Sequence, residues 1–469
     1  MQRNHSLYVL ALLSFVSLPT IGRSLAESSG VKVATALDAY VKAADAAFSY
    51  KVEKTVKSAT HTSYIVRMQS QKWLTKDQVN RTTWEHDLTV IVPAKVASSV
   101  SLLMIGGGAN GKAIPDHADK RLVQIALATK SVVTELKHVP NQPLVFADDP
   151  KKEPKAEDEI IAFSWRKYLE GGDVSWLAQL PMTKSAVRAM DVVTKVCKEN
   201  ASLDVNQFVV TGGSKRGWTT WLTAAVDKRV KAIVPLVIDT LNVRPAFNNH
   251  YQAYGFFAPA VEDYVLEGIM DWQNTKRYAD LLKVVEPYEY RDRFKMPKLL
   301  INAGSDQFFT PDSSQFYFKD LPGEKYLRYV PNAGHSLNGS DAFETLLAYY
   351  ALILTDKARP KFTWEFTDVS TIVVKPEDRP ESVKLWQVSN VEARDFRLET
   401  VGQTWESSAL TASADGSYKA SVDTPDKGWT AFMVELTYET PMGGALKLTT
   451  AARVTPDRLP FPPYEPKRK

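Results

Sequence analysis

The chain has 469 residues, 44% of them hydrophobic and 24% charged, which are ordinary globular proportions and exclude a largely disordered protein. Its formal net charge of +4 is spread along the sequence and excludes a strongly basic nucleic-acid-binding protein, so no nucleic-acid partner is expected. This length allows one large domain and a smaller one. The single cysteine, Cys197, excludes an intramolecular disulfide, and its helical spacing with Met190 and Val193 predicts a buried thiol.

The first 26 residues have the pattern of a signal peptide. Arg3 and His5 give a weakly basic start, residues 7–21 form an apolar run, and residues 24–26 include small residues suited to cleavage. The run is too short to cross a bilayer comfortably, although a single membrane anchor is the alternative. The sequence therefore predicts a secreted or periplasmic protein with no stable membrane span once residues 1–26 are removed.

Residues 27–358 are predicted to form the larger domain. Residues 27 to about 60 are expected to be a helical lead-in, and residues 151–159 a charged loop. Elsewhere strand-like apolar runs alternate with amphipathic helical patterns, which is typical of a mostly parallel sheet covered by helices. Strands are expected at 63–73, 84–93, 99–105, 131–139, 207–211, 230–238, 298–303 and 325–330, and helices at 121–129, 184–199, 214–226 and 342–354.

Two later segments depart from this α/β pattern. Residues 240–294 carry many aromatic side chains without a strong strand pattern, which predicts a helical cap inserted over the site. After Pro360 the sequence changes to short alternating segments separated by turn residues, the pattern of a small β-sandwich. This second domain is predicted for residues 360–465, with strands at 362–366, 370–374, 383–388, 396–398, 417–422, 431–438 and 446–454.

A turn at residues 212–217, Gly-Gly-Ser-Lys-Arg-Gly, lies between a predicted buried strand and a predicted helix. A strand–turn–helix of this kind holds a serine hydroxyl exposed for nucleophilic attack, with small residues beside it because the backbone is crowded. The match to G-x-S-x-G is imperfect, since Arg216 takes the place of the last glycine. A glycine-rich turn with an incidental serine is the alternative, and no phosphate-binding G-x-x-x-x-G-K-[ST] occurs. The context favours Ser214 as a nucleophile.

A serine nucleophile needs a general base and a carboxylate that orients the base. His335 lies in a loop between the last predicted strand and the closing helix, and Asp306 follows the strand at 298–303. The order serine, acid, histidine is that of α/β-hydrolases. Asp312 on the same loop and Asp239 after the preceding strand are rival acids, and the loop position favours Asp306.

Backbone N–H donors are needed for the oxyanion of acyl transfer. Lys215 follows the nucleophile, and Gly107 and Gly108 end an earlier strand, where a hydrolase places its oxyanion loop. These three residues are therefore predicted to form the oxyanion hole.

Arg216, Trp218 and Tyr254 are predicted to contact the substrate. Lys215 and Arg216 put positive charge beside the nucleophile, so we expect an anionic substrate group near the scissile bond. No histidine or cysteine cluster has the spacing of metal ligands, so neither a metal nor a cofactor is expected.

The chain resembles the PhoPQ-activated pathogenicity-related (autocrine proliferation repressor-like) family. The resemblance covers most of the mature chain and is carried by residues 165–193, 210–218, 302–306, 332–335, 393–397 and 427–432. It implies an α/β-hydrolase fold, export, and a serine-hydrolase site at Ser214, Asp306 and His335. The turn around Ser214 is also similar, more locally, to that of glucuronoyl esterases, which act on uronic-acid esters.

The combined pattern predicts hydrolysis of a carboxylic ester or peptide bond, in a small-molecule or peptide substrate, through an acyl-enzyme. A glucuronoyl-esterase-like carbohydrate esterase is the alternative within enzymes. A secreted signalling or binding protein on an idle hydrolase scaffold is the alternative outside them, because fold does not fix function.

Overall fold

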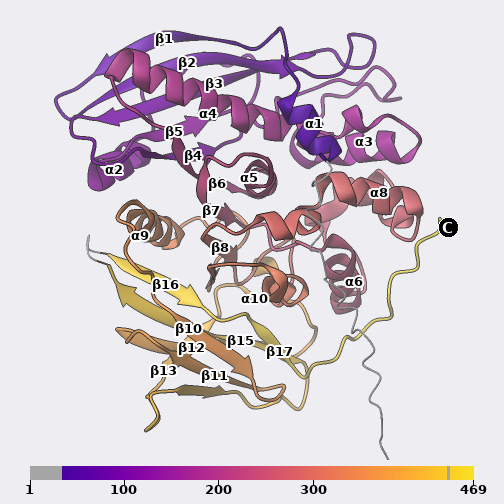
Figure 1. The fold of residues 1–469 in the computed structure, drawn as a ribbon. Coiled ribbons are helices and arrows are strands. Elements are labelled where there is room, and N and C mark those ends of the chain that lie inside the picture. The colour runs from indigo at the N-terminus through magenta and orange to yellow at the C-terminus, as the bar shows by residue number, and fades with distance from the viewer. Residues whose placement is uncertain (1–33, 441–443, 469) are drawn as a thin grey trace, which may run out of the picture. The chain divides into compact units, whose positions relative to one another are not determined.

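The structure, a computed structural model, describes residues 34–440 and 444–468 and is built on a mixed β-sheet (Figure 1). The predicted signal peptide, residues 1–26, lies outside the described residues. Three antiparallel strands form one end of the sheet, namely β1 (Ser49–Lys57), β2 (His61–Lys72) and β3 (Thr83–Pro93). Six mutually parallel strands follow in the spatial order β5 (Val133–Leu136), β4 (Val100–Ile105), β6 (Gln207–Gly213), β7 (Val230–Leu236), β8 (Lys298–Ala303) and β9 (Lys325–Val330).

The order of these strands identifies the fold. From β2 to β9 it runs β2-β3-β5-β4-β6-β7-β8-β9, so β4 and β5 exchange places relative to the chain, and β3 is antiparallel to β5. All six residues of β8 are buried, as expected for a parallel strand with both faces covered. This arrangement is the α/β-hydrolase fold, which confirms the predicted fold class.

Helices connect the strands and cover the sheet. The described α-helices are α1 (Ala36–Lys42), α2 (Lys120–Thr129), α3 (Glu157–Leu169), α4 (Gln179–Ala201), α5 (Lys215–Val226), α6 (Val243–Tyr254), α7 (Glu262–Leu266), α8 (Lys276–Val285), α9 (Ala342–Leu354) and α10 (Leu398–Val401). Short 3₁₀ helices are η1 (Val174–Trp176), η2 (Pro259–Val261), η3 (Ile269–Trp272), η4 (Pro287–Arg293), η5 (Ser313–Phe316) and η6 (Phe318–Asp320). The segment predicted as a cap, between β7 and β8, thus contains α6, η2, α7, η3, α8 and η4.

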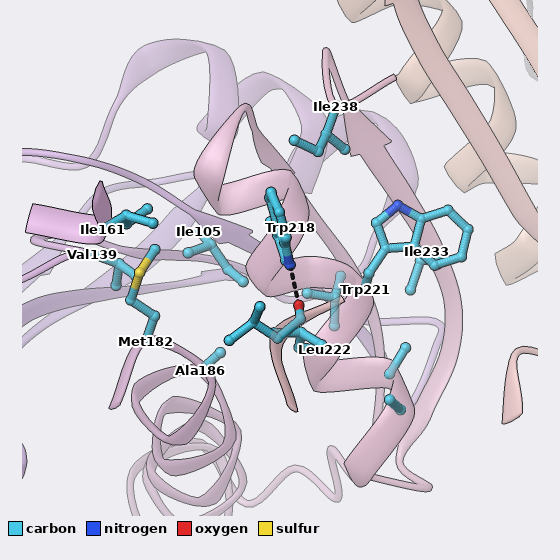
Figure 2. Packing of buried hydrophobic residues seen from close by; sticks show 14 of the residues in the cluster. Ile105, Val139, Ile161, Met182, Ala186, Trp218, Trp221, Leu222, Ile233 and Ile238 are labelled. Carbon is cyan, nitrogen blue, oxygen red and sulfur yellow. Dashed lines mark hydrogen bonds between the residues drawn. The ribbon is translucent and has the colours of Figure 1, made fainter. Parts of the chain in front are cut away.

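Two large hydrophobic clusters hold the helices against the sheet. One contains buried side chains of α4 and α5, and the other contains those of α2 and α9. Figure 2 shows part of the first cluster, which includes Met182 and Ala186 of α4 and Trp218 and Leu222 of α5. Cys197 is buried in α4, as the helical spacing predicts, and burial raises the pKa of its thiol to about 12.

The C-terminal strands continue the central sheet. Beyond β9 the sheet contains β16 (Ala445–Thr449), β15 (Trp429–Glu439), β12 (Ser382–Asn390) and β13 (Glu406–Ala409), with β17 (Arg453–Thr455) also paired to β15. A separate small sheet contains β10 (Phe362–Phe366), β11 (Thr371–Pro376) and β14 (Tyr418–Ser421). Figure 1 shows these strands, coloured orange to yellow, below β8 and α9.

Three local predictions were wrong. The helical lead-in ends at Lys42, and Ser49–Lys57 is a strand instead, because its alternating side chains pair with β2 along most of its length. Residues 396–398 were predicted as a strand, but residues 396 and 397 lie in a loop and Leu398 begins α10. The charged segment at 151–159 contains the start of α3, where three acidic residues occupy the first turn and favour the helix N-terminus.

No helix within residues 34–440 and 444–468 combines the length and apolar character needed to cross a bilayer.

Candidate active site

Ser214 occupies a sharp turn between β6 and α5. Its backbone angles are φ 57° and ψ −126°, a strained conformation for a residue with a side chain. The turn is fixed by two hydrogen bonds, in which the Ser214 N–H donates to the Leu236 carbonyl at 2.9 Å and the Trp218 N–H donates to the Ser214 carbonyl at 3.0 Å. The serine therefore sits at the carboxyl edge of the parallel strands, where α/β proteins commonly bind ligands.

Two glycines make this turn possible. A Cβ atom at Gly212 would lie 2.8 Å from the Arg216 carbonyl oxygen, and one at Gly217 would lie 2.9 Å from the Leu236 carbonyl oxygen. Both distances are shorter than real Cβ contacts. The close approach to β7 thus falls at Gly217 rather than at Arg216, which explains in physical terms why the sequence departs from G-x-S-x-G.

Asp306 and His335 are joined by hydrogen bonds. Asp306 follows β8 and His335 follows β9, the two parallel strands nearest the C-terminal strands. The ring nitrogen Nδ1 of His335 lies 2.9 Å and 3.0 Å from the two carboxylate oxygens of Asp306. Backbone contacts fix both residues, since the Phe308 N–H donates to Asp306 and the His335 N–H donates to the side-chain oxygen of Gln307.

The other ring nitrogen of His335 is available for proton transfer. His335 Nε2 is buried and has no hydrogen-bond partner in the part of the chain that the structure describes. Ser214 Oγ likewise makes no hydrogen bond to His335 here, and such bonds are often long before substrate binds. The structure therefore brings a strained serine and an oriented histidine to the same edge of the sheet, without a closed hydrogen bond between them.

The two rival carboxylates have other partners. Asp239 lies just beyond β7 and is buried, and it accepts hydrogen bonds from the hydroxyls of Tyr317 and Tyr329. Burial raises the pKa of Asp239 to about 7. Asp312 accepts a hydrogen bond of 2.6 Å from buried Arg394. Of the three candidate acids, Asp306 is the one that meets His335.

The glycine-rich segment after β4 is held against β5 and the loop after it. The Gly106 N–H donates to the Leu136 carbonyl, and the carbonyls of Gly106 and Gly107 accept from Val139 and His138. The N–H groups of Gly107 and Gly108 donate to no acceptor among the described residues.

Lys215, the third predicted oxyanion donor, follows Ser214 directly, and its N–H likewise has no acceptor in the described ranges. These three N–H groups retain the capacity to hold an oxyanion.

Arg216 holds this segment in place and is not among the residues that line the pocket at Ser214, described below. Its guanidinium donates to the Val139 carbonyl and lies 2.6 Å from Glu157, and a Cβ at Gly107 would lie 2.5 Å from the guanidinium. The predicted substrate contact of Arg216 therefore has no support in the geometry, because the side chain is committed to packing beneath Gly107.

A pocket opens at Ser214, between the sheet edge and the helical insertion. Most of its walls are aromatic or aliphatic, including Trp165, Trp218, Tyr264, Ile269, Met270 and Phe308. Trp218, one of the predicted substrate contacts, lines it, and its indole N–H donates to the Val285 carbonyl (Figure 2). Tyr254 does not line it, because this buried ring packs against His250 and Arg397.

Acidic residues of α3 neutralise Lys215 at the pocket wall, a feature that the sequence analysis missed. The Lys215 ammonium lies 2.9 Å from both Glu157 and Asp158, and its side chain is 8% exposed. Although burial opposes it, the Arg216 and Lys215 cations lower the pKa of Glu157 to about 2. The sequence does contain an acidic run at the start of α3, but nothing in it shows that this run pairs with Lys215 and Arg216, almost 60 residues away.

C-terminal residues support the loops that carry Asp306 and His335. The indole N–H of Trp405 donates to Ser305 Oγ at 2.9 Å, and the backbone of Trp405 exchanges hydrogen bonds with the Asn332 side chain. The Leu398 N–H donates to the Ser305 carbonyl. The segment from α10 to β13 thus contacts the residue before Asp306 and a residue shortly before His335.

Two sequence comparisons match most of the chain. The family model described as PhoPQ-activated pathogenicity-related protein matches residues 37–397, a range that crosses the predicted domain boundary. The chain is 36% identical over 458 residues to autocrine proliferation repressor protein A of Dictyostelium discoideum, covering 91% of this chain and 92% of that protein.

Two solved structures are similar at lower identity. The acetyl xylan esterase from Paenibacillus sp. R4 is 14% identical with a TM-score of 0.47, and the match covers 67% of this chain and 91% of that chain. A glucuronoyl esterase from Solibacter usitatus is 15% identical with a TM-score of 0.40, covering 68% and 91%. Likeness at this level bears on neither activity nor substrate. The family model and the relative from Dictyostelium together show that the chain belongs to the PhoPQ-activated pathogenicity-related protein family.

Proposed function

We propose that this protein is a secreted or periplasmic serine hydrolase that cleaves a carboxylic ester or peptide bond through an acyl-enzyme on Ser214. The observation that carries the proposal is the pairing of His335 with Asp306 at the edge of the sheet where Ser214 is held in a strained turn. Export is supported by the apolar run at residues 7–21.

Each residue has a defined step in this reaction. Ser214 Oγ attacks the carbonyl carbon while His335 Nε2 takes the hydroxyl proton, and Asp306 stabilises the imidazolium that forms. The oxyanion accepts hydrogen bonds from the N–H of Lys215 and from the Gly107–Gly108 segment. His335 then gives its proton to the leaving group, and water releases the acyl group by the same steps in reverse order.

A fluorophosphonate probe tests the nucleophile directly. The native protein is expected to be labelled and Ser214→Ala is expected not to be, because the probe phosphonylates an activated serine. His335→Ala should be labelled far more slowly, and Ser99→Ala, which removes an exposed serine elsewhere, should match the native protein. Equal labelling of native and Ser214→Ala protein would refute the assignment. Absence of labelling in both would favour the signalling or binding alternative.

A second prediction concerns Trp405 as a positioning residue. Trp405→Phe removes the hydrogen bond to Ser305 next to Asp306, and we expect kcat to fall about tenfold with little change in KM, since small misplacements of catalytic groups are costly. Trp429→Phe is the matched control, because that indole donates to the Arg458 carbonyl instead. Equal effects of the two substitutions on kcat would contradict a positioning role.

A further inference from the structure

The walls of the pocket at Ser214 are mostly apolar. Its polar lining residues are Ser214, Lys215, Asp158 and Thr240, and the other lining side chains are aromatic or aliphatic. The space between the lining side chains, open solvent included, is about 560 Å³. Its walls include Ile269 and Met270, both buried, so a bound group displaces water from apolar surface.

Two of the proposed catalytic groups line the pocket. Ser214 and Lys215, which would hold the carbonyl carbon and its oxygen, both line it, whereas His335 does not. The leaving group must lie within reach of His335 to receive a proton. Phe308 and Phe309 of the lining pack against the His335 ring, so the pocket also reaches the proposed proton donor. In the proposal that follows, the pocket holds the acyl group, which stays on the serine.

The electrostatics of the pocket disfavour an anionic group. Lys215 supplies the cation of the pocket lining, and two carboxylates already pair with it. Asp158 lies in the wall itself, and the Tyr264 hydroxyl donates to it at 3.0 Å. Burial, with the charges of Asp158 and Glu159, raises the pKa of nearby Asp263 to about 6. A carboxylate entering this pocket would meet no unpaired cation in its lining.

We infer that the pocket binds a neutral, apolar acyl group, aromatic or medium-chain aliphatic, and rejects an anionic one. This inference rests on the proposed serine-hydrolase function and names the substrate class of the same site. It replaces the anionic group expected from the sequence, because the two cations beside the nucleophile are held by Glu157 and Asp158.

A matched series of p-nitrophenyl esters tests the inference with a constant leaving group. The acyl groups are acetyl, hexanoyl, 3-phenylpropanoyl, the monoanionic adipoyl and the cationic 6-aminohexanoyl. We expect kcat/KM for the hexanoyl and phenylpropanoyl esters to exceed that for acetyl by tenfold or more, because additional methylenes are buried. The hexanoyl ester should exceed the adipoyl ester about a hundredfold, because the charge would be buried without a partner.

A charge variant then tests the role of Asp158. Asp158→Asn keeps a group that can hydrogen-bond Tyr264 and removes one negative charge from the wall, so kcat/KM for the adipoyl ester should rise about tenfold relative to hexanoyl. Asp116→Asn is the control, since that carboxylate is exposed and pairs with Lys54.

The outcomes separate the two proposals. One outcome overturns the inferred acyl class and leaves the hydrolase function standing. In it, the fluorophosphonate probe labels Ser214, but the acetyl and hexanoyl esters react equally, or the adipoyl or 6-aminohexanoyl ester reacts best. If neither labelling nor hydrolysis occurs, the hydrolase function fails and the inference fails with it.

Discussion

Asp306→Asn is expected to lower kcat about ten-thousand-fold while leaving the fold intact. Nδ1 of His335 lies within 3.0 Å of both carboxylate oxygens of Asp306, so the carboxylate fixes the orientation of the ring and its Nδ1–H tautomer. An amide presents an N–H group to the same nitrogen and favours the wrong tautomer. Steady-state kinetics on the best ester would measure the loss, and a circular dichroism spectrum would check the fold.

Asp239→Asn is the matched control for this substitution. Asp239 is also a buried aspartate at the end of a neighbouring strand, but its partners are two tyrosine hydroxyls. Those hydroxyls can accept hydrogen bonds from an amide as well as donate to it, so kcat should change less than about tenfold. A loss at Asp239 as large as that at Asp306 would show that the acid had been assigned to the wrong strand.

Arg328→Met is expected to destabilise the protein by about 3–5 kcal/mol, because it leaves a buried carboxylate without its partner. The Arg328 side chain on β9 is 1% exposed and forms an ion pair with Glu435 on β15, which is 3% exposed. It also lies 2.9 Å from Asp341. The free energy of unfolding from urea titration would measure the effect.

Two further variants make this prediction specific. The double variant Arg328→Met/Glu435→Leu should recover much of the lost stability, since it removes both buried charges. Lys447→Met, which breaks an ion pair to Asp341 with both side chains about one-third exposed, should cost no more than about 1 kcal/mol. A single Arg328→Met variant within 1 kcal/mol of the native protein would contradict the argument.

Much of the sheet could be predicted because its strands are short apolar runs. The predicted bounds 298–303 and 325–330 coincide with β8 and β9, and 342–354 coincides with α9. The strand β1 could not be distinguished in this way, because most of its side chains are polar, none is fully buried, and its stability comes from pairing with β2. The local composition there favours neither helix nor strand, and the segment becomes a strand because it pairs with β2.

In the candidate site, too, some features could be predicted from the sequence and others could not. Ser214, Asp306 and His335 could be placed because their order and their positions after strands follow from the fold. Whether Lys215 and Arg216 are ion-paired could not be predicted, because the sequence near them does not show which carboxylates lie close to them in the fold. Those partners, Glu157 and Asp158, are on a helix far away in sequence. Their negative charges compensate the positive charges of Lys215 and Arg216 beside Ser214.

The pairing of β16 with β9 has a consequence for the integrity of the sheet. Without the C-terminal strands, β9 would be an edge strand of largely buried side chains with unpaired backbone groups, the kind of edge that recruits other chains. Thr449 occupies this position instead, opposite Leu327 in the ladder and accepting a hydrogen bond from the Tyr329 N–H through its hydroxyl. The strand β16 thus covers part of the β9 edge and reduces the backbone that this edge offers to another chain.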